Sequence, residues 1–210
     1  MTTTAPDSAP VAEPSASAGA TARVRTASAV WVLIAGVLGL AASLVLTIEK
    51  VELLINPAYV PSCSINPVLS CGSVMVTPQA SAFGFPNSLI GIVAFSVVLV
   101  TGVLALAKVP LPRWYWAGLA AGTLLGTVFV HWLIVQSLYH IGALCPYCMV
   151  VWAVTIPLLV VTSSIAFASS SGNRIAGFVA QWRWSLVALW FTAIFLMILV
   201  RFWSYWSTLL

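Results

Sequence analysis

Long apolar runs alternate with shorter polar segments along most of the chain. The runs cover about residues 29–48, 88–107, 114–138, 147–168 and 185–205. Each has about 20 residues or slightly more, enough for an α-helix to cross the ~30 Å hydrocarbon core of a lipid bilayer. The pattern predicts an all-α polytopic membrane protein with five transmembrane helices.

Two segments fall outside this helical pattern. Residues 1–26 are rich in Thr, Ala, Pro and Ser without an apolar period, so we expect a disordered cytosolic tail before a membrane domain at 27–210. Residues 49–86 form the one long connection, and we expect the charges that begin with Glu49 only to mark the end of the first span. Val74–Phe85 is apolar but too short to span, which predicts a cover lying in the membrane interface.

Composition agrees with a membrane location. The chain is 61% apolar and 6% charged, whereas a soluble domain has about 25% charged residues. The mean hydropathy is +1.08. The net charge of +4 comes from a few basic residues and is too sparse to form a nucleic-acid-binding face, so we expect no nucleic-acid partner.

The basic residues also predict the orientation in the membrane. With five spans, the tail and the second and fourth connections share one side, which carries six of the eight Lys and Arg residues. They are Arg23, Arg25, Lys108, Arg113, Arg174 and Arg183. Lys50 lies on the other side, and Arg201 is expected to extend toward the headgroups there. Because basic loops stay in the cytosol, we expect a multi-pass plasma-membrane protein with a cytoplasmic N-terminus and an extracytoplasmic 49–86 loop.

This topology brings all four cysteines to the outer face. Cys63 and Cys71 lie in the long loop, and Cys145-Pro-Tyr-Cys148 begins the fourth span. Disulfides form and persist in the outer compartment. Pro146 suits the first helical position, so Cys145 falls near the N-cap and Cys148 in the first turn, where the helix dipole lowers a thiol pKa.

Three interpretations of the cysteines remain open: a zinc site, inert structural disulfides, and redox exchange. Zinc requires four permanent thiolates in a closed tetrahedron, which fits poorly with two thiols beside the lipid core. We therefore expect no metal, and favour electron transfer in series between two cysteine pairs. The chain has no Gly-rich nucleotide motif and only two histidines, so a lipid-soluble quinone is the acceptor left by elimination.

Three stretches carry a resemblance to a known family. They are Cys63-Ser-Ile-Asn-Pro-Val-Leu-Ser-Cys71 with the following Gly-Ser-Val, then Gly84-Phe-Pro-Asn-Ser-Leu-Ile-Gly91, then Cys145-Pro-Tyr-Cys148. Over about residues 27–168 the chain resembles bacterial, most closely actinobacterial, members of the vitamin K epoxide reductase family. The resemblance implies a four-helix bundle around a quinone site, here followed by a fifth transmembrane helix.

The resemblance also implies roles for single residues. Cys148 is the sulfur that reacts with the quinone, of menaquinone or ubiquinone type, and Cys145 exchanges with Cys71. Cys63 completes the pair that meets the partner. The position of Asn87 contacts the quinone in family members, although helix capping is the alternative for an amide at the start of a span.

Two further residues are candidates for the quinone site. Trp152 replaces a tyrosine of some relatives one turn after Cys148, where it can pack on a quinone ring but cannot act as a phenol. His131, with Gln136, is polar within the third span, and either contacts the quinone or makes an interhelical hydrogen bond.

The function expected is that of a quinone-dependent thiol oxidase that forms disulfides in the cell envelope. Many bacterial relatives carry a fused thioredoxin-like domain that this sequence lacks, so we expect a separate extracytoplasmic thioredoxin-fold partner. The alternatives are vitamin K epoxide or quinone reduction in the same fold, disfavoured for the epoxide by Trp152, and a small metal-binding membrane protein or permease. An unrelated four-helix disulfide generator has its cysteine pairs in the reverse order.

Overall fold

The computed structural model describes residues 21, 22, 24–167 and 174–208. Most of the expected N-terminal tail therefore lies outside the described residues. Five long helices dominate: α1 (Thr26–Ile55), α3 (Asn87–Leu106), α4 (Arg113–Val135), α5 (Pro146–Ala166) and α6 (Arg174–Arg201). Each is long and apolar enough to cross a membrane. Within the described ranges no strand is present, and the prediction of an all-α polytopic membrane protein is confirmed.

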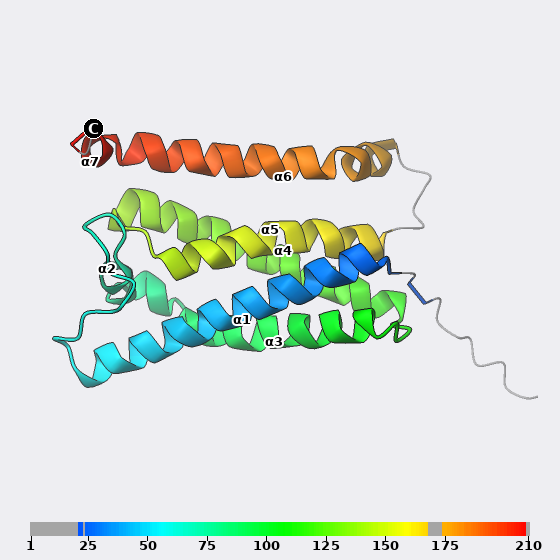
Figure 1. Cartoon of the computed structure of the whole chain (residues 1–210), viewed down its shortest axis with the longest axis horizontal. Coiled ribbons are helices and arrows are strands. Elements are labelled where there is room, and N and C mark those ends of the chain that lie inside the picture. Colours follow the sequence, from blue (N-terminus) through cyan, green and yellow to red (C-terminus); the bar gives the residue numbers. More distant parts are fainter. Residues whose placement is uncertain (1–20, 23, 168–173, 209–210) are drawn as a thin grey trace, which may run out of the picture.

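Helices α1, α3, α4 and α5 form a bundle, with α1 packed on α3 and α5, and α5 packed on α4 (Figure 1). Glycines allow α1 and α3 to approach closely. A Cβ on Gly36 would lie 2.6 Å from the Cα of Leu99, and one on Gly102 would lie 2.6 Å from the Cα of Leu33. Small residues at such contacts let backbones meet where no hydrophobic effect drives helices together.

Helix α6 lies along one side of the bundle in Figure 1, and its Trp184 packs against Trp31 of α1 with ring centroids 5.7 Å apart. Near the cysteine end it packs through a cluster that includes Ile134 of α4 and Trp152 of α5. The helix begins at Arg174, although the sequence pattern predicted a connection there. Residues 174–183 contain no proline, so nothing in this stretch prevents the helix from extending through it. The membrane-spanning portion by composition is Gln181–Arg201. A short helix, α7 (Trp203–Trp206), follows.

Residues 56–86 fold over one end of the bundle and contain α2 (Cys71–Met75) and the 3₁₀ helix η1 (Pro78–Ser81) (Figure 1). At the same end, α4 continues into the π-helix η2 (Gln136–Ile141), which stops at Gly142. Gly142 takes φ 71°, a left-handed conformation that suits glycine, and its N–H donates to the Ser137 carbonyl at 3.0 Å. The chain then turns directly into α5.

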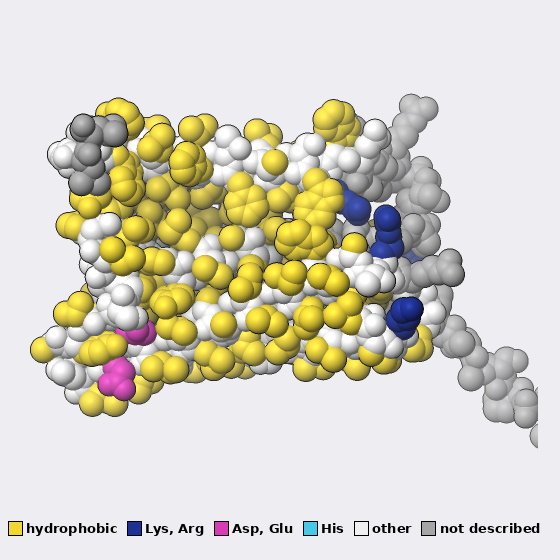
Figure 2. Space-filling model, in the orientation of Figure 1, with side chains coloured by type: hydrophobic (Ala, Val, Ile, Leu, Met, Phe, Trp, Pro, Cys, Tyr) yellow, Lys and Arg dark blue, Asp and Glu magenta, His cyan; other side chains and the backbone are white. Residues whose placement is uncertain are grey.

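A wide apolar band covers the bundle in the view of Figure 2. Lys and Arg side chains gather at the end where α1 begins, and acidic side chains lie at the cysteine end. The two ends of the helices therefore differ in charge as the sequence predicts.

Candidate redox site

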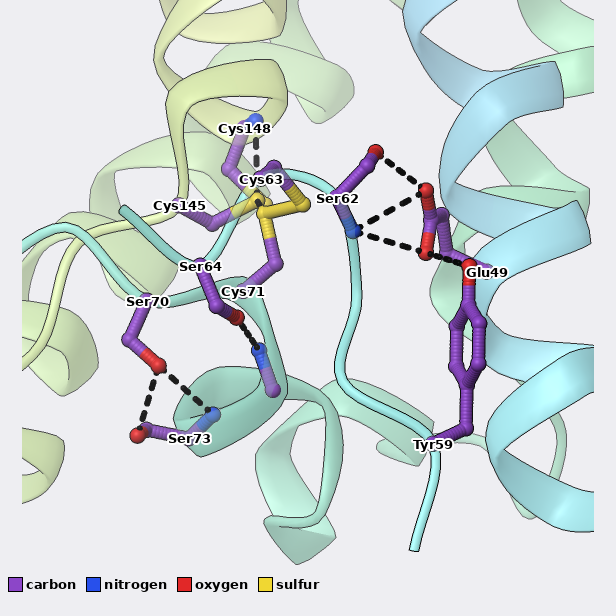
Figure 3. The surroundings of a disulfide bond; sticks show 11 residues. Glu49, Tyr59, Ser62, Cys63, Ser64, Ser70, Cys71, Ser73, Cys145 and Cys148 are labelled. Atoms are coloured by element: carbon purple, nitrogen blue, oxygen red, sulfur yellow. Dashed lines mark hydrogen bonds between the residues drawn. A yellow bond between two sulfur atoms is a disulfide. The ribbon is translucent and has the colours of Figure 1, made fainter. Parts of the chain in front are cut away.

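The structure brings the four cysteines together at one end of the bundle. Cys63 and Cys71 form a disulfide with a Cα–Cα distance of 5.5 Å, and Cys145 and Cys148 are free thiols (Figure 3). The Sγ of Cys145 lies 3.2 Å from the Sγ of Cys71, although the two residues are 74 positions apart. Thiol–disulfide exchange requires one sulfur to attack another directly, so this contact places the two pairs within reacting distance.

The local sequence of α5 explains the position of Cys145. Pro146 occupies the first helical position, which makes Cys145 the N-cap. Its Sγ accepts a hydrogen bond from the backbone N–H of Cys148 at 3.4 Å. A hydrogen bond from the Cys148 thiol is the largest influence on Cys145 and, with backbone N–H groups, lowers its pKa against the opposing effect of burial. The Cys145 thiol therefore ionises more readily than an ordinary cysteine thiol.

Backbone contacts hold the Cys71 side of the loop against the start of α5. The N–H of Ser70 donates to the Leu144 carbonyl at 2.9 Å, and the N–H of Leu144 donates to the Val68 carbonyl at 2.7 Å. The Ser70 side chain caps α2 by accepting from the N–H of Ser73 at 3.3 Å. Cys71, the first residue of α2, is thereby fixed beside Cys145.

Side chains from the last turns of α1 hold the same loop. The Glu49 carboxylate accepts hydrogen bonds from the Tyr59 hydroxyl at 2.9 Å and from the hydroxyl and backbone N–H of Ser62, next to Cys63 (Figure 3). The Lys50 ammonium donates to the Met75 carbonyl at 2.7 Å. The Glu49 bond raises the pKa of Tyr59.

The sequence interpretation of Glu49 as a mere marker of the span's end is wrong. Helix α1 continues to Ile55, and the Glu49 side chain is buried. A buried carboxylate requires hydrogen-bond donors, and the sequence offers them in the hydroxyl residues before Cys63. That coincidence is the signal that could have identified it.

A cavity of about 560 Å³ opens between α1, α3, α4 and α5 and reaches the free cysteines. Its lining is mostly apolar, with a few polar groups near the sulfur end, as is typical of small-molecule sites. Those near the sulfurs include Asn87, Gln136 and Lys50, and both Cys145 and Cys148 contribute to the wall. The volume and the apolar wall fit a quinone head group with part of an isoprenoid chain.

Asn87 and Trp152 both line this cavity. Their contact with a quinone stays a prediction. Asn87 also supports the loop, since its Nδ2 donates to the Gln79 carbonyl at 2.7 Å and its Oδ1 accepts from the Ala82 N–H at 3.1 Å. The N-cap of α3 is Pro86, so the amide does not cap its own helix. Gln136 faces the cavity with its Oε1 3.5 Å from the Gln79 Nε2.

His131 is not among the residues that line the cavity. Its Nδ1 lies 2.8 Å from the Thr127 carbonyl, and its Nε2 accepts from the Trp190 indole N–H at 2.8 Å. Those partners leave the neutral ring with its proton on Nδ1. The residue thus links α4 to α6 through the Trp190 hydrogen bond, and its contact with a quinone stays a prediction.

Arg201, expected to extend toward the headgroups, is exposed at the end of α6 and also makes a contact that the sequence did not predict. Its Nε donates to the Leu138 carbonyl at 2.8 Å, which ties the end of α6 to the π-helix η2. A π-helix departs from the regular i→i−4 hydrogen bonds of an α-helix, and in η2 the Leu138 carbonyl accepts the bond from Arg201. Sequence pattern alone gives no sign of η2.

A model of the vitamin K epoxide reductase family matches residues 30–163, more than half of the chain. The chain belongs to this family. The match contains all four cysteines and the cavity-lining helices, and it ends before α6. A comparison with curated proteins finds no significant match. Membership in the vitamin K epoxide reductase family makes the protein a multi-pass membrane oxidoreductase of quinone-linked disulfide chemistry.

Proposed function

We propose that the protein is a quinone-dependent thiol oxidase that generates disulfides in the cell envelope. Electrons pass from a thioredoxin-fold partner through Cys63/Cys71 to Cys145/Cys148 and on to a membrane quinone. The observation that carries the proposal is the 3.2 Å contact between the Cys145 thiol and Cys71 of the disulfide. Two inert disulfides would have no need of this contact.

The exchange steps balance without any further reactant. A thiolate of the partner attacks the Cys63 Sγ, Cys71 leaves as a thiolate, and the partner's second thiol resolves the mixed disulfide, so the partner leaves oxidised. Cys71 then attacks Cys145 of an inner disulfide and releases Cys148 as a thiolate. Attack by Cys63 on Cys71 restores the outer disulfide, leaving Cys145 and Cys148 reduced. That product is the state seen in the structure.

The inner pair is placed to pass its electrons to the cavity. A quinone bound there accepts two electrons and two protons as the Cys145/Cys148 dithiol becomes a disulfide. Cys148 lines the cavity within the first turn of α5, and Trp152 follows it one turn later. Asn87 and Gln136 supply amide groups for ring oxygens. Since Trp152 has no phenol, we propose quinone rather than vitamin K epoxide as the substrate.

The proposed orientation places the cysteine end outside the cell. The basic side chains at the opposite end, where α1 begins, support it (Figure 2). A cysteine-free variant with one thiol returned either at position 71 or within 174–183 tests it by labelling intact cells with an impermeant maleimide. We expect labelling of position 71 alone, and labelling of the 174–183 thiol alone would reverse the orientation.

The direct test of the function is anaerobic addition of short-chain menaquinone and ubiquinone analogues to the reduced protein in detergent. We expect quinol formation with simultaneous loss of two thiols for each quinol. Protein alkylated beforehand with N-ethylmaleimide is the matched control and should form none. Quinol formation equal to that of the control would overturn the proposal.

A further inference from the structure

Cys63 is the residue that the partner must reach, yet it is only 5% exposed. This consideration rests on the proposed function, in which a soluble protein attacks that sulfur. A protein thiol cannot approach a buried sulfur along the S–S axis unless the loop that carries this sulfur moves. The contacts that hold the segment before Cys63 therefore decide how fast the partner can react.

The two sides of the cysteine loop are held by different means. On the Cys71 side, backbone hydrogen bonds link Ser70 and Val68 to Leu144 at the start of α5. On the Cys63 side, the contact to the bundle is the Glu49 carboxylate, which holds the Tyr59 hydroxyl and Ser62 (Figure 3). One buried side chain thus holds the segment that leads directly into the reactive Cys63.

We propose that Glu49 is a positioning residue that latches the 59–62 segment, and with it the adjacent Cys63, against α1, and that this latch is released when the partner docks. When the latch opens, water replaces the three donors that bind the Glu49 carboxylate, and the Ser70–Leu144 hydrogen bond stays intact. Cys71 therefore stays beside Cys145 while Cys63 becomes accessible. The latch thus lets Cys63 react with the partner without moving Cys71, which exchanges with Cys145 inside the protein.

The test measures access to the outer disulfide without a quinone or a partner. In a Cys145→Ala/Cys148→Ala background, dithiothreitol reduces Cys63–Cys71, and free thiols are counted by the gel shift of a maleimide-linked polymer. We expect Glu49→Gln to increase the reduction rate about tenfold, because hydrogen bonds to a charged acceptor are the strong ones. Tyr59→Phe removes one donor and should increase the rate less.

Glu52→Gln is the matched control, since Glu52 is an exposed carboxylate one turn further along α1. It should leave the reduction rate unchanged. Equal rates for Glu49→Gln and Glu52→Gln would overturn the latch. Ser62→Ala, which keeps the carboxylate and removes one donor, gives a second reading if Glu49→Gln folds poorly.

A second measurement separates a latch from general loosening of the loop. In a Cys63→Ala background with Cys145 and Cys148 intact, Glu49→Gln should leave the yield of a Cys71–Cys145 disulfide unchanged. A parallel fall in that yield would show that Glu49 merely stabilises the whole loop. Diamide, added without a quinone, serves as the two-electron oxidant that forms the Cys71–Cys145 bond, so failure of the quinone assay leaves this result readable.

Discussion

The two cysteine pairs lie in contact, yet the chain builds them in different ways. Cys145 and Cys148 take their geometry from the first turn of α5, with Pro146 and the backbone N–H of Cys148 setting the position of each sulfur. Cys63 and Cys71 lie in an irregular loop whose shape depends on residues from α1 and from the start of α5. The inner pair is a local structure, and the outer pair is a tertiary one.

This difference suits the proposed roles. A pair that meets a fixed cavity gains from the rigidity of a helix, since Cys148 must keep its place in the wall. A pair that must meet both a soluble protein and Cys145 needs one sulfur that stays and one that moves. Backbone bonds keep Cys71 in place, whereas the Glu49 side chain holds the segment before Cys63 in a contact that we propose is released.

Among variants that test the separate roles of the two pairs, removal of Cys148 should have the largest effect. Cys148→Ala should lower quinone reduction by at least about a hundredfold, even when dithiothreitol replaces the partner, because the reduced Cys145 then has no second thiol with which to form a disulfide. Anaerobic stopped-flow absorbance of the quinone measures the rate. Cys63→Ala is the control and should keep residual activity with dithiothreitol, which can reduce the inner pair directly. Normal turnover in Cys148→Ala would contradict the division of roles.

The second prediction concerns the mixed disulfide that joins the two pairs during exchange. Removal of Cys63 takes away the thiol that resolves the bond from the outer side, so Cys63→Ala should accumulate a Cys71–Cys145 disulfide in most molecules. Their sulfurs already lie 3.2 Å apart. Peptide mapping without reduction identifies the linked fragments. A Cys63–Cys145 disulfide in fully active Cys71→Ala protein would instead exchange the roles of the two loop cysteines.

The sequence predicts the inner pair and the spans well because both depend on local pattern. An apolar run of about 20 residues predicts a transmembrane helix, and a proline after an N-cap cysteine predicts a helix start, without reference to any distant residue. The contacts of Glu49 and Arg201 could not be predicted, for the opposite reason. Their partners, Ser62 and the Leu138 carbonyl, are 13 and 63 residues away and are brought together only by the fold.

The third prediction concerns the pH dependence of the inner pair. The hydrogen bond from Cys148 lowers the pKa of Cys145, so the Cys145 thiolate persists below the pH at which an ordinary thiol becomes protonated. Alkylation of Cys145 by iodoacetamide in the reduced protein should lose rate only as the pH falls through that lowered pKa. Cys148→Ala removes the main cause, and the profile should move to higher pH, which lowers the rate several-fold at neutral pH. An unshifted profile would show that the helix N-terminus alone sets the reactivity.

The smallest effect expected is that of Asn87, which belongs to the helical part of the site but supports the loop. Asn87→Ala removes the bonds to the Gln79 carbonyl and the Ala82 N–H, and should lower the free energy of unfolding by about 1–2 kcal/mol. It should also raise the KM for the quinone a few-fold, since Asn87 lines the cavity, while the Cys71–Cys145 trap forms as before. Thermal melting and steady-state kinetics measure the two effects. Asn56→Ala is the control, because Asn56 is exposed and its amide contacts only the nearby Ala58 N–H. A lower trap yield in Asn87→Ala would mean that the segment of residues 76–86, which Asn87 holds through Gln79 and Ala82, helps to position Cys71. The two pairs would then share more of their structural support than their separate positions in a helix and a loop indicate.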